Sequence, residues 1–151
     1  MAAAWRLGHK EGEMATPTIP DQGGIAILLR ALLVFDSGTF LVAGLLHLGV
    51  RIAGITEPPI PDAATVEFIA GLVLAVAAAG VVARARWAWY AALAAQALAA
   101  AGVSLGMAAL AFGLGPTTML NFVYHRVMLV LLIAGLAVVI LPAGRRALGQ
   151  R

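Results

Sequence analysis

Residues 63–83, AATVEFIAGLVLAVAAAGVVA, decide the fold of this chain. The stretch contains a single charged residue, Glu67, and it is followed closely by two arginines, Arg84 and Arg86. A helix rises about 1.5 Å per residue, so about 20 residues cross the ~30 Å hydrocarbon layer of a bilayer. A membrane strand would instead alternate between apolar and polar residues over about ten positions. We therefore expect this stretch to form a membrane-spanning α-helix.

Three other apolar segments of similar length surround this one, over about residues 24–50, 87–112 and 118–142. The segment EPPIPD at 57–62 separates the first two spans, because its prolines cannot continue a helix. Asp62 is well placed to cap the second helix, and Thr117 or Thr118 to cap the fourth. The chain is therefore predicted to be all-α, a four-helix transmembrane bundle with up-down-up-down order.

The composition of the chain agrees with a membrane domain. Hydrophobic residues make up 62% of the sequence and charged residues 11%, whereas soluble domains carry about 25% charged residues. The absence of cysteine excludes disulfides and thiolate metal ligands. A net charge of +3 would suit a nucleic-acid binder, but the arginines lie at segment ends. This placement favours anchoring at the membrane surface, so we expect membrane lipids as partners and no nucleic acid.

The pattern divides the chain into three regions. We expect a disordered cytoplasmic segment over residues 1–23, the four-helix transmembrane domain over 24–142 and a cytoplasmic basic tail over 143–151. Translation from Met1 or from Met14 is left open by the sequence. With the N-terminus inside, eight of the ten Lys and Arg residues face the cytoplasm and only Arg51 and Arg126 do not. This bias predicts that both termini are cytoplasmic.

Three ionisable side chains lie near the ends of different spans. In the predicted topology His47, Glu67 and His125 all come roughly 5–10 Å below the outer membrane face, counted at 1.5 Å per residue. Met107 on the third span reaches a similar depth. Because ionisable groups in hydrocarbon are costly and usually functional, the shared depth predicts a site.

These residues suit several kinds of ligand. Two imidazoles and a carboxylate can bind zinc, iron or copper, and two histidines or His with Met can ligate haem iron. We therefore take His47, Glu67, His125 and Met107 as candidate ligands of a divalent metal or haem. Four more polar residues, Asn121 and Tyr124 nearby and Asp36 and Gln96 near mid-membrane, are candidate ligand-binding residues.

Other interpretations of the same residues stay open. Without a metal, Glu67 and a histidine can pass a proton or hold the polar head of a lipid-like molecule. A structural interpretation pairs Glu67 with His47 or with Arg126, which would join helices without binding anything. No phosphate-binding loop, dinucleotide fingerprint or nucleophile elbow is present, and the outer loops are short. We therefore do not expect a conventional enzyme.

The stretch from Leu29-Arg30 through Phe40-Leu-Val-Ala-Gly44-Leu-Leu-His47 resembles the first helix of DoxX-like small membrane proteins. The rest of the spans, with Arg86-Trp-Ala-Trp89, resemble uncharacterised four-helix bacterial membrane proteins. The resemblance implies an accessory subunit of a membrane oxidoreductase system. We expect the protein to lie in a bacterial plasma (inner) membrane and to associate with copies of itself or with a larger complex. We thus expect an accessory subunit with an outer-leaflet metal or haem site. A carrier of a lipid-like molecule and a purely structural subunit are the alternatives.

Overall fold

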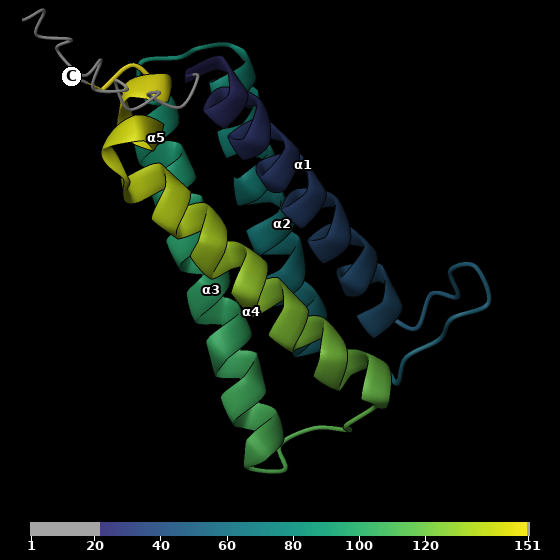
Figure 1. The fold of residues 1–151 in the computed structure, drawn as a ribbon. Coiled ribbons are helices and arrows are strands. Elements are labelled where there is room, and N and C mark those ends of the chain that lie inside the picture. Colours follow the sequence, from purple (N-terminus) through teal and green to yellow (C-terminus); the bar gives the residue numbers. More distant parts are fainter. Residues whose placement is uncertain (1–21, 151) are drawn as a thin grey trace, which may run out of the picture.

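The computed structural model describes residues 22–150, and over this range the protein is all-helical with no strand. Its helices, drawn in Figure 1, are α1 (Gln22–His47), α2 (Pro61–Val82), α3 (Ala88–Ala111), α4 (Met119–Ile140) and the short α5 (Pro142–Ala147). The first four are long and apolar enough to cross a membrane. The predicted all-α fold with four apolar helices is therefore confirmed, and the protein is a multi-pass membrane protein.

The observed helix starts show which capping predictions were right. Thr118 caps α4, because its hydroxyl oxygen accepts a hydrogen bond from the backbone N–H of Asn121 at 3.0 Å. The prediction that Asp62 caps α2 was wrong, since α2 already begins at Pro61 and Ile60 is the residue before it. Proline suits the first helical position because its missing N–H has no partner there in any case. Asp62 lies instead within the first turn.

The outer surface of the bundle is apolar and its interior is built from small residues. Large side chains such as Ile27, Leu72 and Leu105 are exposed to 64%, 59% and 72%. Lipid is the natural environment for such a surface, because exposed apolar patches of this extent are rare on soluble monomers. The buried core contains alanines on α2 and α3, including Ala77, Ala92, Ala95 and Ala99. Small residues let membrane helices approach closely.

The closest approach of α1 to α2 is at Gly71. The Ser37 hydroxyl on α1 donates a buried hydrogen bond to the Gly71 carbonyl oxygen at 2.8 Å. A Cβ atom at position 71 would lie 2.9 Å from the Leu41 side chain and 3.2 Å from the Ser37 carbonyl oxygen. Only glycine leaves room for this contact, which therefore fixes how the two helices pack.

The chain after α4 does not extend away as a simple tail. Residues expected to form a basic tail make α5, which packs against α1 and α4. Gly144 is buried, and a Cβ atom there would overlap the carbonyl oxygen of Val138. The Arg145 guanidinium lies 5.1 Å from the ring centre of Trp89, whose indole N–H donates to the Val139 carbonyl at 3.0 Å. The expected disordered segment mostly lies outside the described residues, although its last two residues begin α1.

Candidate functional site

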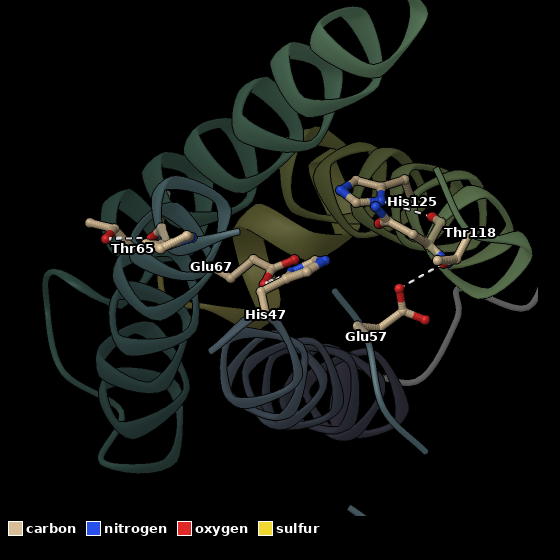
Figure 2. A network of polar contacts seen from close by, with 8 residues as sticks. His47, Glu57, Thr65, Glu67, Thr118 and His125 are labelled. Carbon is tan, nitrogen blue, oxygen red and sulfur yellow. Dashed lines mark hydrogen bonds and ion pairs between the residues drawn. The ribbon is translucent and has the colours of Figure 1, made fainter. Parts of the chain in front are cut away.

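The centre of the site is a buried pair formed by His47 and Glu67. His47 is the last residue of α1 and Glu67 lies on the second turn of α2, and their exposed fractions are 3% and 4%. His47 Nδ1 lies 2.7 Å from Glu67 Oε2 (Figure 2). The second nitrogen of the imidazole, Nε2, and the second carboxyl oxygen, Oε1, are buried without a hydrogen-bond partner. The pair therefore joins α1 to α2 and leaves two polar atoms uncommitted, that is, without a hydrogen-bond partner.

His125 brings a second imidazole to the same end of the bundle. Its Nδ1 lies 2.9 Å from the backbone carbonyl oxygen of Asn121, one turn earlier on α4. Because a carbonyl oxygen only accepts, Nδ1 must carry the proton and Nε2 of the neutral ring is a free acceptor. Nε2 lies 3.3 Å from the position a Cβ atom would take at Gly106, so the ring faces α3 (Figure 2). Glycine at 106 leaves room for it.

Both imidazoles line one cavity of about 400 Å³ between the four long helices. Its polar lining atoms come from His47, Glu67, Asn121 and His125, together with Asp62 near the start of α2. Its remaining wall is apolar and comes mainly from α2 and α3, with Val66, Ala70, Ala99, Gly102, Val103, Leu105, Gly106, Ala109 and Leu110. We call the end of the bundle that holds this cavity the histidine end.

A second cavity of about 260 Å³ lies against α1 and α4 at the same end. His47 and Asn121 line both cavities, and Tyr124 lines only the second one. The Tyr124 hydroxyl is buried without a partner, and its ring makes edge contacts with Phe40 and His125. The polar centre therefore lies between two largely apolar spaces, with uncommitted polar atoms on both sides.

Glu57 is part of this end, although the sequence analysis did not single it out. Its Oε2 accepts a hydrogen bond of 2.7 Å from the Thr118 hydroxyl (Figure 2). Glu57 also lines the second cavity. The bond ties the α1–α2 loop to the first turn of α4. The only signal in the sequence is its place directly before Pro58 and Pro59, which stiffen the loop that carries it.

The expected mid-membrane layer is present but separate from this end. Asp36 on α1 and Gln96 on α3 are both fully buried, and the Gln96 amide donates to Asp36 Oδ2 at 3.3 Å. Neither residue lines the two cavities at the histidine end. The Gln96 amide instead packs against Gly135 of α4, where any Cβ atom would clash with it. This layer therefore joins α1, α3 and α4.

Two residues from the sequence analysis lie elsewhere. Met107 packs against the hydrophobic core and lines neither cavity, so it is not brought to the histidines. The open alternative of a Glu67–Arg126 ion pair is not formed. The Arg126 guanidinium lies 3.3 Å from the ring centre of Phe122 and donates to the Phe122 carbonyl oxygen. The alternative bond between His47 and Glu67 is the one observed.

The expected metal centre is not supported by the geometry. Among residues 22–150, no group of three or more His, Asp or Glu side chains lies close enough together to hold a metal ion. His47, Glu67 and His125 share a cavity but do not converge on one point as a ligand set. A site for an organic ligand needs no such convergence, because separate polar groups can meet different atoms of the ligand.

The fold and this cavity define a class, a multi-pass helical membrane protein with a buried polar centre between its helices. Comparison of the chain with protein-family models, with curated proteins and with solved structures finds no match. The resemblance to DoxX-like proteins therefore stays a prediction. A fold alone does not define a function, which resides in the chemistry of the site.

Proposed function

We propose that this protein binds a small amphiphilic molecule at its histidine end, with the polar part at His47 and Glu67 and the apolar part along α2 and α3. The observation that carries the proposal is the set of buried, unpartnered polar atoms around a mostly apolar cavity. A buried polar atom without a partner costs about 1–3 kcal/mol. A bound ligand that supplies partners would remove this cost.

The uncommitted atoms indicate the chemistry of the ligand. Glu67 Oε1 is an acceptor when the carboxyl is ionised, and His47 Nε2 is an acceptor in the neutral ring whose one proton is on Nδ1. His125 Nε2 is an acceptor in the neutral ring. A ligand that matches them carries hydroxyl or amine hydrogens at one end. Its body is apolar, because the walls on α2 and α3 are apolar, and ligand cavities with a few placed polar groups are of this kind.

The size of the cavity also fits this class. Small-molecule pockets measure about 300–1,000 Å³, and the larger cavity measures about 400 Å³. The smaller cavity shares His47 and Asn121 with it, which supports a longer ligand that passes the polar centre on both sides. Such a molecule would be taken up from the bilayer and stay bound to the protein. This behaviour fits a carrier, or an accessory subunit that presents the molecule to a larger complex.

Retention of the ligand tests the proposal directly. Full-length protein purified in a mild detergent is analysed by native mass spectrometry, and we expect a bound organic molecule that is released on denaturation. Glu67→Gln should lower its retention, because the carboxylate acceptor is lost. The matched control is Asp36→Asn, an equally buried carboxyl that lines neither cavity at this end. Equal retention in wild type and Glu67→Gln, or an empty wild type, would contradict the proposal.

A steric variant tests the same cavity without changing its charges. Ala109→Leu adds volume at the apolar wall on α3 and should lower ligand retention. Ala79→Leu on α2, which lines neither cavity, is the matched control and should retain the ligand. If both variants retain the ligand equally, the apolar body does not occupy this cavity.

The orientation in the membrane is part of the proposal. We infer an up-down-up-down bundle in a bacterial inner membrane, with both termini cytoplasmic and the histidine end towards the outer face. The arginine bias supports it, because cytoplasmic ends of membrane helices collect Lys and Arg. Since the chain has no cysteine, single cysteines at Thr56 and Ala147 can be labelled without background. We expect an impermeant maleimide to label Thr56→Cys from outside and Ala147→Cys only from inside, and the reverse pattern would invert the topology.

A metal or haem is a second candidate, favoured by one observation. The Nδ1 of His47 is held by a carboxyl group while Nε2 is uncommitted, and metal-ligating histidines are commonly oriented in this way. Elemental analysis and visible absorbance of purified protein test it. Bound metal or haem that is lost in a His47→Ala/His125→Ala variant would favour it over the organic ligand.

A further inference from the structure

The opposite end of the bundle contains a third cavity, lined by arginines. It measures about 330 Å³ and is formed by the first turns of α1, the end of α2, the start of α3 and α5. Arg30, Arg84 and Arg146 line it, together with apolar residues that include Val81 and Leu148. We call this the arginine end. Three guanidinium groups around one cavity repel one another, and an anion between them would offset this repulsion.

These arginines have no side-chain partner among the described residues, 22–150. None of Arg30, Arg84 and Arg146 makes a side-chain hydrogen bond or an ion pair with a described residue. The Nε atom of Arg30 is fully enclosed, so this donor is buried and unsatisfied. The segments that form the cavity, residues 23–30, 81–88 and 146–149, contain no Asp or Glu. A buried donor without a partner calls for a ligand or an ion.

The backbone that presents two of these arginines is also specialised. Arg84 has a φ of 53°, in the left-handed region that favours glycine, and it forms the turn between α2 and α3. Strained positions of this kind are enriched at functional sites. Arg146 is held by α5, and the close packing of Gly144 against Val138 seats that helix over the end of the bundle. The two side chains are thus brought to the cavity from different elements.

We propose that this cavity binds a phosphate-bearing anion, the headgroup of an anionic phospholipid. Arginine is suited to phosphate because its planar guanidinium forms two parallel hydrogen bonds to it. The cavity lies at the end of lipid-facing helices, where phosphate groups of the bilayer are the nearest anions. Basic pockets between membrane helices are known to bind such headgroups. Val81 and Leu148 can contact the acyl part of the lipid.

Lipid titration of the full-length protein tests this site. Protein in detergent is mixed with phosphatidylglycerol or with phosphatidylcholine of the same acyl chains, and retained lipid is counted by native mass spectrometry. We expect preferential retention of phosphatidylglycerol.

Arg146→Gln and Arg30→Gln should each weaken the binding of phosphatidylglycerol about tenfold, since each removes a charge-assisted bond. Arg51→Gln and Arg126→Gln, at the other end of the bundle, are the controls and should change nothing. Arg30→Lys keeps the positive charge, so phosphatidylglycerol binding that persists in this variant would show that the loss in Arg30→Gln is not a folding defect.

The outcomes separate the possible sources of the anion and define what would overturn the proposal. Displacement of phosphatidylglycerol by inorganic phosphate that also binds alone supports the phosphate chemistry and assigns the site to a soluble anion. No preference for phosphatidylglycerol, or equal loss in the Arg51 and Arg126 controls, overturns the proposal. Residues 1–21 contain Glu11, Glu13 and Asp21. Lipid binding that appears only after these three are neutralised would show that the chain's own acidic segment fills the cavity, which also overturns it.

Discussion

The histidine end and the arginine end share α1, α2 and α3, with α4 added at the first and α5 at the second, but they surround their cavities with opposite chemistry. At the histidine end the uncommitted atoms are mainly acceptors, on His47 and Glu67, and they are buried deep between helices. At the arginine end they are donors, on Arg30, Arg84 and Arg146, and two of the three side chains are exposed. The first cavity therefore suits a molecule with donor hydrogens, and the second suits an anion.

Each end of the bundle is held in place by a different kind of contact. The histidine end depends on polar contacts between elements, the His47–Glu67 pair and the Glu57–Thr118 bond. The arginine end depends on close backbone packing at Gly144, which seats α5. Between the two ends, the Ser37–Gly71 contact holds α1 and α2 together. We therefore expect that a change at one end leaves the other end intact, and variants can test this independence.

The largest effect is expected from Gly144→Ala. The added Cβ overlaps the Val138 carbonyl oxygen, which is backbone and cannot move aside, so α5 must leave its position and take Arg146 with it. Retention of phosphatidylglycerol should fall by more than about tenfold, while ligand retention at the histidine end stays unchanged. Gly24→Ala is the control at the same end, because a Cβ there meets nothing within 4 Å. Loss of ligand at both ends would show that the ends are not independent.

Next in size is Gly71→Ala, which acts on the middle of the bundle. Its Cβ would meet the Leu41 side chain at 2.9 Å and the Ser37 carbonyl oxygen at 3.2 Å, so the Leu41 side chain must shift and α1 must move slightly away from α2. We expect a loss of about 1–3 kcal/mol in the free energy of unfolding, measured by reversible detergent denaturation. Gly38→Ala, with nothing within 4 Å of its Cβ, is the reference that shares the gain in helix propensity. Equal stability of the two variants would mean that the close approach is not limiting.

A smaller effect is expected from Thr118→Val at the histidine end. The change removes the cap of α4 and the partner of Glu57 together, at a cost of about 1 kcal/mol. Hydrogen exchange at the Asn121 amide should rise in the variant. Thr65→Val is the isosteric control, because the Thr65 hydroxyl donates only to the Pro61 carbonyl on its own helix. Similar exchange in both variants would argue against the cap as the main constraint.

The smallest effect is the coupling between His47 and Glu67. A double-mutant cycle with alanine at both positions should give about 0.6 kcal/mol, the average found for hydrogen bonds in membrane bundles. The same cycle for Asp36 and Gln96 should give less, because that bond is 3.3 Å long against 2.7 Å. A larger coupling in the second pair would shift the main polar constraint from the histidine end to the middle layer.

Much of this fold follows from the sequence because helix length and depth follow simple geometry. Long apolar runs fix the four spans, and a constant rise per residue brings His47, Glu67 and His125 to the same end of the bundle, where they line one cavity. The cap at Thr118 was predictable, since a hydroxyl before an apolar run is a common helix start. Asp62 shows the limit of this rule, because the neighbouring proline took the first helical position.

The remaining contacts depend on rotation and loop closure, which the sequence does not encode locally. Met107 has the right depth but packs into the core, because depth alone does not fix the face of a helix. The bond from Glu57 to Thr118 joins residues 61 positions apart through a loop. The arginine cavity likewise depends on α5 folding back, and no local pattern in the last ten residues indicates that.

A density map of the full-length protein in lipid nanodiscs, at a resolution that shows side chains, would test ligand binding at the histidine end most directly. We expect elongated, non-protein density in the cavity at the histidine end, within hydrogen-bond distance of His47 Nε2 and Glu67 Oε1. A map in which only water molecules satisfy these atoms would contradict it, and so would a map in which the helices close the cavity.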